Sequence, residues 1–158
     1  VIAVTGTPGT GKTTFAKRIA RVLGYRYIDV NVVIAQNKLS EGYDRKRRCK
    51  IIDTKRLNKT ITDIAKKSDV GLVVDSHLSH YLPKQIVSTC IVMRCNLKTL
   101  QKRLIKRGYS KAKIRENLDS EIFEVCLTEA KEQGHKVIEI YTDKKIDYKK
   151  IKRKIKKN

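Results

Sequence analysis

The sequence predicts an α/β fold in which a five-stranded parallel sheet carries helices on both faces. Five short apolar runs alternate with segments whose apolar residues recur at helical spacing. The first run is followed directly by a glycine-rich stretch, residues 6–13, that opens a helical segment. Because 158 residues suit one compact unit, we expect a single domain over residues 1–158.

Five runs rich in β-branched and aliphatic residues are the expected strands. Each is short and mostly apolar, as strands buried on both faces of a parallel sheet are. They lie at residues 1–5, 25–30, 70–75, 86–95 and 136–142. The third run ends in Asp75, which places a carboxylate at the edge where such sheets bind ligands.

The segments between these runs have the apolar spacing of amphipathic helices. In residues 12–23, Phe15, Ile19 and Val22 share one stripe, and Gly24 follows as a C-cap. The same reasoning predicts further helices at residues 31–40, 53–67, 97–107 and 116–133, and a basic one at 144–158. Residues 41–50 are polar and basic, and we expect a loop there.

The composition is strongly basic. Lysine and arginine number 37 against 16 aspartate and glutamate, a net charge of +21. This excess predicts a polyanionic partner such as RNA, although a general lysine bias, as in heat-adapted proteins, would give the same composition. The four cysteines form no C-x-x-C pair, which favours reduced thiols over a zinc site. No apolar run approaches the roughly 20 residues of a membrane span, so we expect a cytoplasmic protein without membrane contact.

Residues Gly6–Thr13 fit the pattern G-x-x-x-x-G-K-[ST] between an expected strand and an expected helix. In this context glycines let main-chain amides close around phosphate oxygens at the positive end of the helix. The pattern therefore predicts an ATP site of the P-loop type, in which Lys12 reaches the β and γ phosphates, Thr13 binds Mg²⁺ and Thr14 contacts the α phosphate. The alternative is a chance glycine-rich turn. The expected ATP-binding residues are Gly9, Thr10, Gly11, Lys12, Thr13 and Thr14 of this stretch, together with Arg103 and Arg107 further along the chain.

Two residues that follow the third strand are candidates for the same site. Asp75 would share Mg²⁺ with Thr13, because a carboxylate commonly orders the ion at this edge, and the alternative is a turn cap. His77 would reach the γ phosphate or the attacking nucleophile, and the alternative is a structural histidine. His80 and His135 are expected to be bystanders.

A cluster of cations follows the fourth strand. Arg103 and Arg107 are four residues apart and share one helical face, and Gly108 offers a hinge. Guanidinium groups can neutralise the charge that develops on a transferred phosphoryl group. We therefore expect a short mobile lid over ATP at residues 106–116, with Arg115 as a further candidate. A solvated basic face is the alternative.

A second substrate could enter between the second strand and the third helix. Residues 29–54 are expected to form this insert, and its basic residues could hold a monophosphate, without a ranking among them. A surface loop is the alternative. The polar candidates are Asp29, Asn31, Arg45, Arg47, Arg48 and Lys50.

Four stretches together resemble the small adenylate-kinase-like NTPases of the coilin-interacting nuclear ATPase type, including their archaeal members. They are TGTPGTGKTT (5–14), IIDTKRL (51–57), VVDSH (73–77) and RLIKRGYSKAKIRENLDSEIFEVCLTEA (103–130). The resemblance covers nearly the whole chain. It implies a P-loop NTPase fold like that of nucleoside monophosphate kinases, with a monophosphate insert near 29–54 and a short lid near 106–116.

The resemblance also implies an activity and partners. Members transfer a phosphoryl group reversibly from ATP to a nucleoside monophosphate, hydrolyse ATP, and assist late maturation of the small ribosomal subunit by binding a ribosomal protein of its platform. Gly9, Gly11, Lys12, Thr13 and Thr14 would accordingly bind the ATP phosphates. Arg107 would be the lid arginine, and Asp75 with His77 the extended metal-site motif.

The chain departs from the family pattern in its acceptor half. Ser76 stands where an aromatic residue is common, and Ala35 or Gln36 where an arginine is expected, with Lys38 the nearest base. Residues 45–48 are basic where the family is acidic. These departures concern affinity for the monophosphate rather than for ATP.

Three functions remain open at this point. The first is a nucleoside monophosphate kinase that uses Mg-ATP as donor. The second is an ATP-driven ribosome-assembly factor that contacts a small-subunit ribosomal protein or rRNA and has little kinase activity. The third is a kinase of another small metabolite such as shikimate or gluconate, for which Asp29-Val30-Asn31 is a weak indication.

Overall fold

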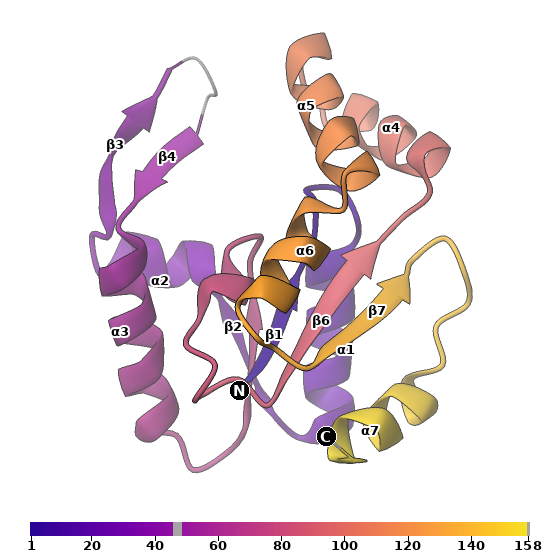
Figure 1. The fold of residues 1–158 in the computed structure, drawn as a ribbon. Helices are drawn as coiled ribbons and strands as arrows, with labels where there is room; N and C mark the ends of the chain where they lie inside the picture. The colour runs from indigo at the N-terminus through magenta and orange to yellow at the C-terminus, as the bar shows by residue number, and fades with distance from the viewer. Residues whose placement is uncertain (46–48, 158) are drawn as a thin grey trace.

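A computed structural model gives the fold of the chain and describes residues 1–45 and 49–157. Five parallel strands form one sheet in the order β2-β5-β1-β6-β7 (Figure 1). The fold class predicted from the sequence is thereby confirmed. The strands are β1 (Ile2–Thr5), β2 (Arg26–Asp29), β5 (Leu72–Asp75), β6 (Thr89–Arg94) and β7 (Val137–Tyr141).

Alternating residues of the central strand feed two separate cores. In β1, Ala3 packs into one core, while Ile2 and Val4 pack into the other. Helices α1 (Lys12–Leu23) and α7 (Tyr148–Lys157) cover the second face, where Phe15 and Ile151 belong to the same cluster. Helices α2 (Val30–Gln36), α3 (Thr54–Lys66) and α6 (Val125–Glu132) contribute buried side chains to the first core.

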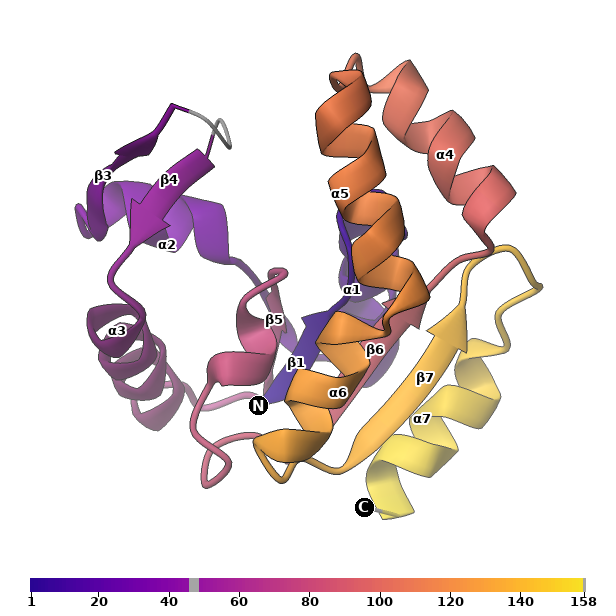
Figure 2. The same cartoon turned by 45° about the horizontal axis from the view of Figure 1, so that its top comes forward.

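Two helices rise above the carboxyl ends of the strands. Helix α4 (Leu97–Lys106) and helix α5 (Lys111–Ile122) lie side by side, with Leu100 and Leu104 packed against residues of the turn and of α5 (Figures 1 and 2). Gly108 reverses the chain between them with a φ of 71°, a left-handed conformation that glycine adopts without steric cost. The predicted helix end near residue 108 is confirmed.

The prediction of one helix over residues 116–133 is wrong. Helix α5 begins earlier, at Lys111, and the chain breaks at Phe123 and Glu124 before α6. Glu124 has a left-handed φ of 54°, and its carboxylate accepts from Arg94 Nη1 at 2.9 Å. The ion pair of Glu124 with β6 therefore accompanies a left-handed backbone conformation, which the spacing of apolar residues does not indicate.

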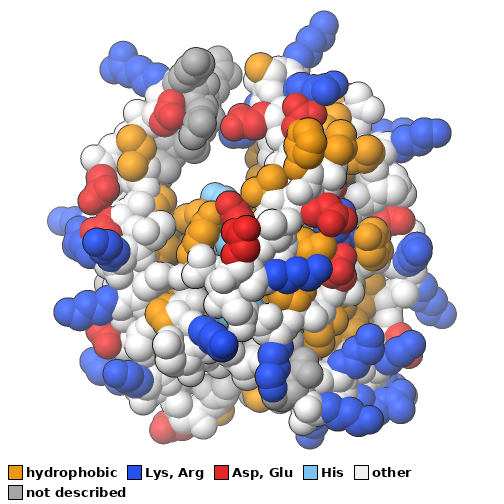
Figure 3. All heavy atoms as spheres, viewed as in Figure 1, with side chains coloured by type: hydrophobic (Ala, Val, Ile, Leu, Met, Phe, Trp, Pro, Cys, Tyr) orange, Lys and Arg blue, Asp and Glu red, His pale blue; other side chains and the backbone are white. Residues whose placement is uncertain are grey.

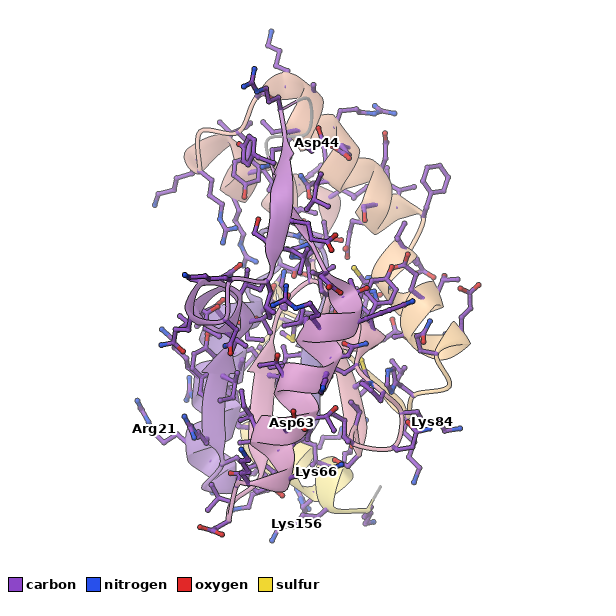
Figure 4. The ribbon with its side chains drawn as sticks, turned by 90° about the vertical axis from the view of Figure 1, so that its left-hand side faces the viewer. Arg21, Asp44, Asp63, Lys66, Lys84 and Lys156 are labelled. Carbon is purple, nitrogen blue, oxygen red and sulfur yellow. The ribbon has the colours of Figure 1, made fainter. Side chains whose placement is uncertain are left out.

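The prediction of a loop at 41–50 is also wrong. Strands β3 (Ser40–Asp44) and β4 (Cys49–Ile52) form an antiparallel hairpin apart from the main sheet. The sequence of the hairpin shows no apolar alternation. Of its large apolar residues, Tyr43 and Ile51 are exposed, and Ile52 is half-buried against the core. Figure 4 shows it above α3, whose Asp63 and Lys66 lie on the outward side. Of the predicted acceptor residues, Arg47 and Arg48 and the side chain of Lys50 lie outside the described part of the chain.

The remaining connection contains a short 3₁₀ helix, η1 (Ser79–Tyr81), between β5 and β6. No helix among residues 1–45 and 49–157 has the length and apolar character needed to cross a bilayer.

Candidate functional site

The glycine-rich loop lies between β1 and α1, at the carboxyl edge of the sheet. Gly6, Gly9 and Gly11 have φ values of 136°, 91° and 94°, which side chains rarely adopt. A Cβ on Gly6 would collide with the carbonyl oxygen of Met93 at the end of β6. The loop therefore needs glycine both for its curvature and for its close approach to the neighbouring strand.

Lys12 closes the loop from the inside. Its Nζ donates to the carbonyl oxygens of Gly6 at 2.8 Å and Thr7 at 3.1 Å. Burial lowers the pKa of Lys12 to about 8, with the negative charge of Asp75 acting in the opposite direction. A half-buried ammonium held by neutral carbonyls is poised to accept an anionic partner.

A small cavity of about 90 Å³ opens directly beside Lys12. It is lined by Gly9, Gly11, Lys12, Thr13, Thr14 and Arg107. Five of the six loop residues predicted to bind ATP, together with the predicted Arg107, thus line one space. The exception is Thr10, whose buried hydroxyl and main-chain amide both donate to Thr7 O, at 2.8 and 3.2 Å, so that Thr10 shapes the loop instead of facing the cavity.

Thr13 and Asp75 come together as the metal hypothesis requires. Thr13 Oγ1 donates to Asp75 Oδ2 at 2.6 Å, because β5 and β1 are neighbours and end at the same edge. Tyr27 OH donates to the same carboxylate oxygen at 3.0 Å. Burial and then the charge of Asp75 raise the pKa of Tyr27 well above its usual range, which keeps the phenol a donor.

This donor set fits Mg²⁺. The ion prefers oxygen ligands and is commonly held by one or two protein oxygens together with substrate phosphates. Within the described residues there is no group of three or more His, Cys, Asp or Glu side chains that could hold a metal by itself. Thr13 and Asp75 would therefore hold the ion together with a bound polyphosphate.

His77 faces a larger cavity of about 530 Å³ on the far side of Lys12. Burial and then the nearby Lys12 ammonium lower the pKa of His77 to about 4. The imidazole is therefore neutral near pH 7, and it can exchange a hydrogen bond with a ligand but supplies no positive charge. The cavity is also lined by Asn31, Asp75, Arg107, Tyr109 and Lys113.

The two arginines of α4 have different surroundings. Arg103 Nη1 donates to Thr142 Oγ1 at 2.9 Å and to Gly9 O at 3.3 Å, so it supports the loop from outside. Arg107 lines the 90 Å³ and 530 Å³ cavities and also a third cavity on the α1 side of the loop. Arg115 does not join them in this way: its Nε pairs with Asp119 at 3.0 Å, and its side chain is 77% exposed.

A third cavity, of about 620 Å³, lies on the α1 side of the loop. Phe15, Ile146 and Tyr148 give it an apolar wall, and the Phe15 and Tyr148 rings stack with centroids 5.6 Å apart. Thr14, Arg103 and Arg107 form its polar side. A flat apolar wall beside a phosphate cradle suits a nucleobase.

Sequence reasoning missed several residues of the site. Tyr27 and Tyr148 could not be assigned, because their roles depend on which strand and helix lie beside the loop. His80, expected to be a bystander, lines the 530 Å³ cavity but is held inside the protein by Thr5 Oγ1 at 2.6 Å and Glu129 Oε2 at 2.9 Å. Glu121, which contacts the loop through Thr7 at 2.8 Å, gave no signal beyond its charge.

The chain is similar to known proteins over most of its length. The family described as AAA domain matches residues 2–124. The adenylate kinase isoenzyme 6 homolog of Caenorhabditis elegans is 38% identical over 131 residues, which are 83% of this chain and 72% of the relative. The adenylate kinase isoenzyme 6 homolog FAP7 of Saccharomyces cerevisiae is 34% identical over 149 residues, 92% of this chain and 75% of the relative.

A solved structure shares the fold. Shikimate kinase from Acinetobacter baumannii in complex with shikimate superposes with a TM-score of 0.62, covering 99% of this chain and 90% of the kinase. Its sequence is 14% identical, so the likeness concerns the fold alone.

The lowered pKa of Lys12 predicts how phosphate binding depends on pH. Above pH 8 the free ammonium loses its proton, whereas bound phosphate favours the charged form, so binding must take up a proton. We expect the affinity for ATP to fall by up to about tenfold per pH unit above this value. Calorimetry in two buffers of different ionisation enthalpy measures the uptake. Equal affinity for ATP at pH 7 and pH 9, without proton uptake, would contradict the predicted contact between Lys12 and the ATP phosphates.

Proposed function

Because the chain belongs to the adenylate kinase isoenzyme 6 family, we propose that it transfers the γ-phosphoryl group of Mg-ATP to a nucleoside monophosphate such as AMP. One observation carries the proposal. The small cavity beside Lys12 shares Gly9, Gly11 and Thr14 with the 620 Å³ cavity, and Lys12 and Thr13 with the 530 Å³ cavity. Transfer requires donor and acceptor to meet at one phosphoryl group, as two cavities joined at a phosphate cradle allow.

On the donor side, we propose that the 620 Å³ cavity takes the nucleoside of ATP. The base would lie against the wall of Phe15 and Tyr148, and Thr14 would meet the α phosphate. Lys12 would exchange its loop carbonyls for the β and γ phosphates, which offer it full negative charges. Magnesium, when bound by Thr13 and Asp75, would neutralise charge on the phosphate oxygens.

At the junction, we assign Arg107 the stabilisation of the transferred group. It lines the donor, phosphate and acceptor cavities and follows α4 directly, next to the turn at Gly108. A guanidinium remains charged and can contact two oxygens at once. Residues 106–116, which contain Arg107 and Lys113, would act as the lid.

On the acceptor side, we propose that Lys113 and Arg107 receive the monophosphate. Lys113 Nζ lies 4.5 Å from the centroid of the Tyr109 ring, which holds the ammonium at the cavity. Within residues 29–54, Asn31 lines this cavity, whereas none of residues 40–44, 51 and 52, whose side chains are described, does so. The molecule is hollowed between the hairpin and α5 (Figure 3), which leaves an entrance for the acceptor.

The surroundings of Asp29 do not favour a kinase of shikimate or gluconate. The Asp29 carboxylate accepts from the main-chain amide of Asn31 at 2.9 Å and caps α2. It is therefore engaged in local structure rather than turned toward a substrate.

We also propose ATP hydrolysis and a role in maturation of the small ribosomal subunit, with contact to a ribosomal protein and rRNA. Helix α7 supports the RNA contact. Its apolar residues Ile151 and Ile155 are buried, and six of its seven lysines and arginines are exposed, while Lys152 Nζ donates to the carbonyl oxygen of Val22 at 2.9 Å. Figure 3 shows basic side chains gathered over this helix and the segment before it. Without a monophosphate, water in the acceptor cavity would take the phosphoryl group.

The kinase proposal predicts the products of an assay. AMP should stimulate ATP turnover and give two ADP per ATP consumed, because the acceptor cavity then holds a better nucleophile than water. Chromatography of the nucleotides, with a parallel phosphate assay, measures both products. If every common monophosphate yields only ADP and inorganic phosphate, the kinase proposal is wrong and ATP hydrolysis remains.

The role of Arg107 predicts a large rate effect. Arg107→Ala should lower turnover by about a hundredfold or more, because charge on the transferred phosphoryl group loses its stabilisation. Steady-state kinetics and the melting temperature should be measured together. Lys111→Ala is the matched control, since Lys111 is an exposed cation in the same segment. A variant with an unchanged rate would make Arg107 part of a solvated basic face.

The role of α7 predicts salt-dependent RNA binding. Affinity should fall by at least about a hundredfold between about 50 and about 200 mM salt, because several phosphate contacts release counterions. Three exposed cations of α7 would be replaced by Gln: Lys149, Arg153 and Lys156. The matched control replaces three exposed cations of α3: Lys55, Lys59 and Lys66. Equal losses in both variants, or binding that is insensitive to salt, would overturn the assignment to α7.

A further inference from the structure

Glu121 is a buried carboxylate on the helix beside the phosphate loop. It lies in the last turn of α5 and is 5% exposed. Its Oε1 accepts from Arg94 Nε at 2.8 Å and from the main-chain amide of Cys95 at 3.3 Å. These two contacts fasten it to the carboxyl end of β6.

The second oxygen of Glu121 reaches the phosphate loop. Thr7 Oγ1 donates to Glu121 Oε2 at 2.8 Å, and both side chains are buried. The charge of Arg94 is balanced even without Glu121, since Arg94 also pairs with Glu124 at 2.9 Å and with Glu139 at 3.3 Å. The Glu121 carboxylate therefore joins α5 to the phosphate loop, a link that the ion pair with Arg94 does not make.

Thr7 is a central point of the loop. Its carbonyl oxygen accepts from Lys12 Nζ at 3.1 Å, from the Thr10 amide at 3.2 Å and from Thr10 Oγ1 at 2.8 Å. A shift of Thr7 would consequently displace the Lys12 ammonium, which donates to this carbonyl, and the turn that Thr7 and Thr10 form before Gly11. Glu121 thus acts on the phosphate cradle through one hydroxyl.

The same helix forms part of the acceptor cavity. Lys113, Glu116, Asn117 and Ser120 line that cavity from α5, and Glu121 is the next residue. The helix is therefore held against the loop at the point where its acceptor-facing residues end.

We infer that Glu121 is a positioning residue that fastens α5 to the phosphate loop through Thr7 and so fixes the spacing between the donor cradle and the acceptor cavity. The inference rests on the proposed function for its effect on transfer, but its effect on the loop concerns ATP binding alone. Glu121 itself touches neither reacting group.

The test compares Thr7→Val, which removes only the hydroxyl, with Thr7→Ser, which keeps it. We expect Thr7→Val to weaken binding of a non-hydrolysable ATP analogue by about tenfold, since a buried charged acceptor loses its partner. The maximal rate of ADP formation should fall more than tenfold, with little change in the KM for AMP. Thr7→Ser should restore both quantities to within about threefold.

Glu121→Gln tests the other partner, and Glu139→Gln is its matched control. Both remove one carboxylate from Arg94, but Glu139 has no contact with Thr7. We expect faster amide hydrogen exchange across residues 6–14 in Glu121→Gln and Thr7→Val, and unchanged exchange there in Glu139→Gln. The double variant Thr7→Val with Glu121→Gln should bind the ATP analogue with the same affinity as the single variant that binds it less tightly.

Two results would overturn the inference. One is wild-type binding and exchange in Thr7→Val; the other is multiplication of the two single effects in the double variant. If Glu121→Gln does not fold, the Thr7 pair and the exchange data decide. If the wild-type protein binds ATP but forms no ADP from AMP, the proposed kinase activity fails, while the binding and exchange measurements still test Glu121.

Discussion

The close approach of the phosphate loop to the end of β6 is the constraint from which the site follows. Gly6 lies so near the Met93 carbonyl that no side chain fits between them. The loop must therefore turn at the sheet edge, above the carboxyl ends of β1 and β6, before α1 begins. That path places Thr13 within 2.6 Å of Asp75 and leaves the cavities on either side of Lys12.

Charge is distributed unevenly around this edge. Among the described residues, Lys12, Arg107 and Lys113 face the acceptor cavity without forming an ion pair, while Arg94 is surrounded by three glutamates behind the loop. Asp75, Glu116 and Glu129 line the same cavity and balance part of this positive charge, and a bound phosphate would place further negative charge beside the cations. The buried Arg94 needs no ligand because its partners belong to the fold.

The sequence predicted the features that depend on local pattern. Hydrophobic spacing located the five strands and most helices, and the glycines and lysine of residues 6–13 located the phosphate site. The hairpin of β3 and β4 was missed because Ser40–Asp44 contains one large apolar residue, Tyr43, and therefore shows no apolar alternation. The break at Glu124 and the contacts of Tyr27, Tyr148 and Glu121 depend on tertiary neighbours, which a single sequence does not reveal.

The stacking of Tyr148 on Phe15 connects the donor cavity to helix α7. Tyr148 is the first residue of α7, so one aromatic ring belongs both to the wall of the donor cavity and to the helix that carries the basic face. The Arg18 guanidinium lies 4.4 Å from the centroid of the same ring and clamps it from α1. If the donor cavity takes a nucleotide as proposed, Tyr148 would couple that cavity to α7, and by thermodynamic reciprocity a ligand on the basic face of α7 and the nucleotide would change each other's affinity by the same factor.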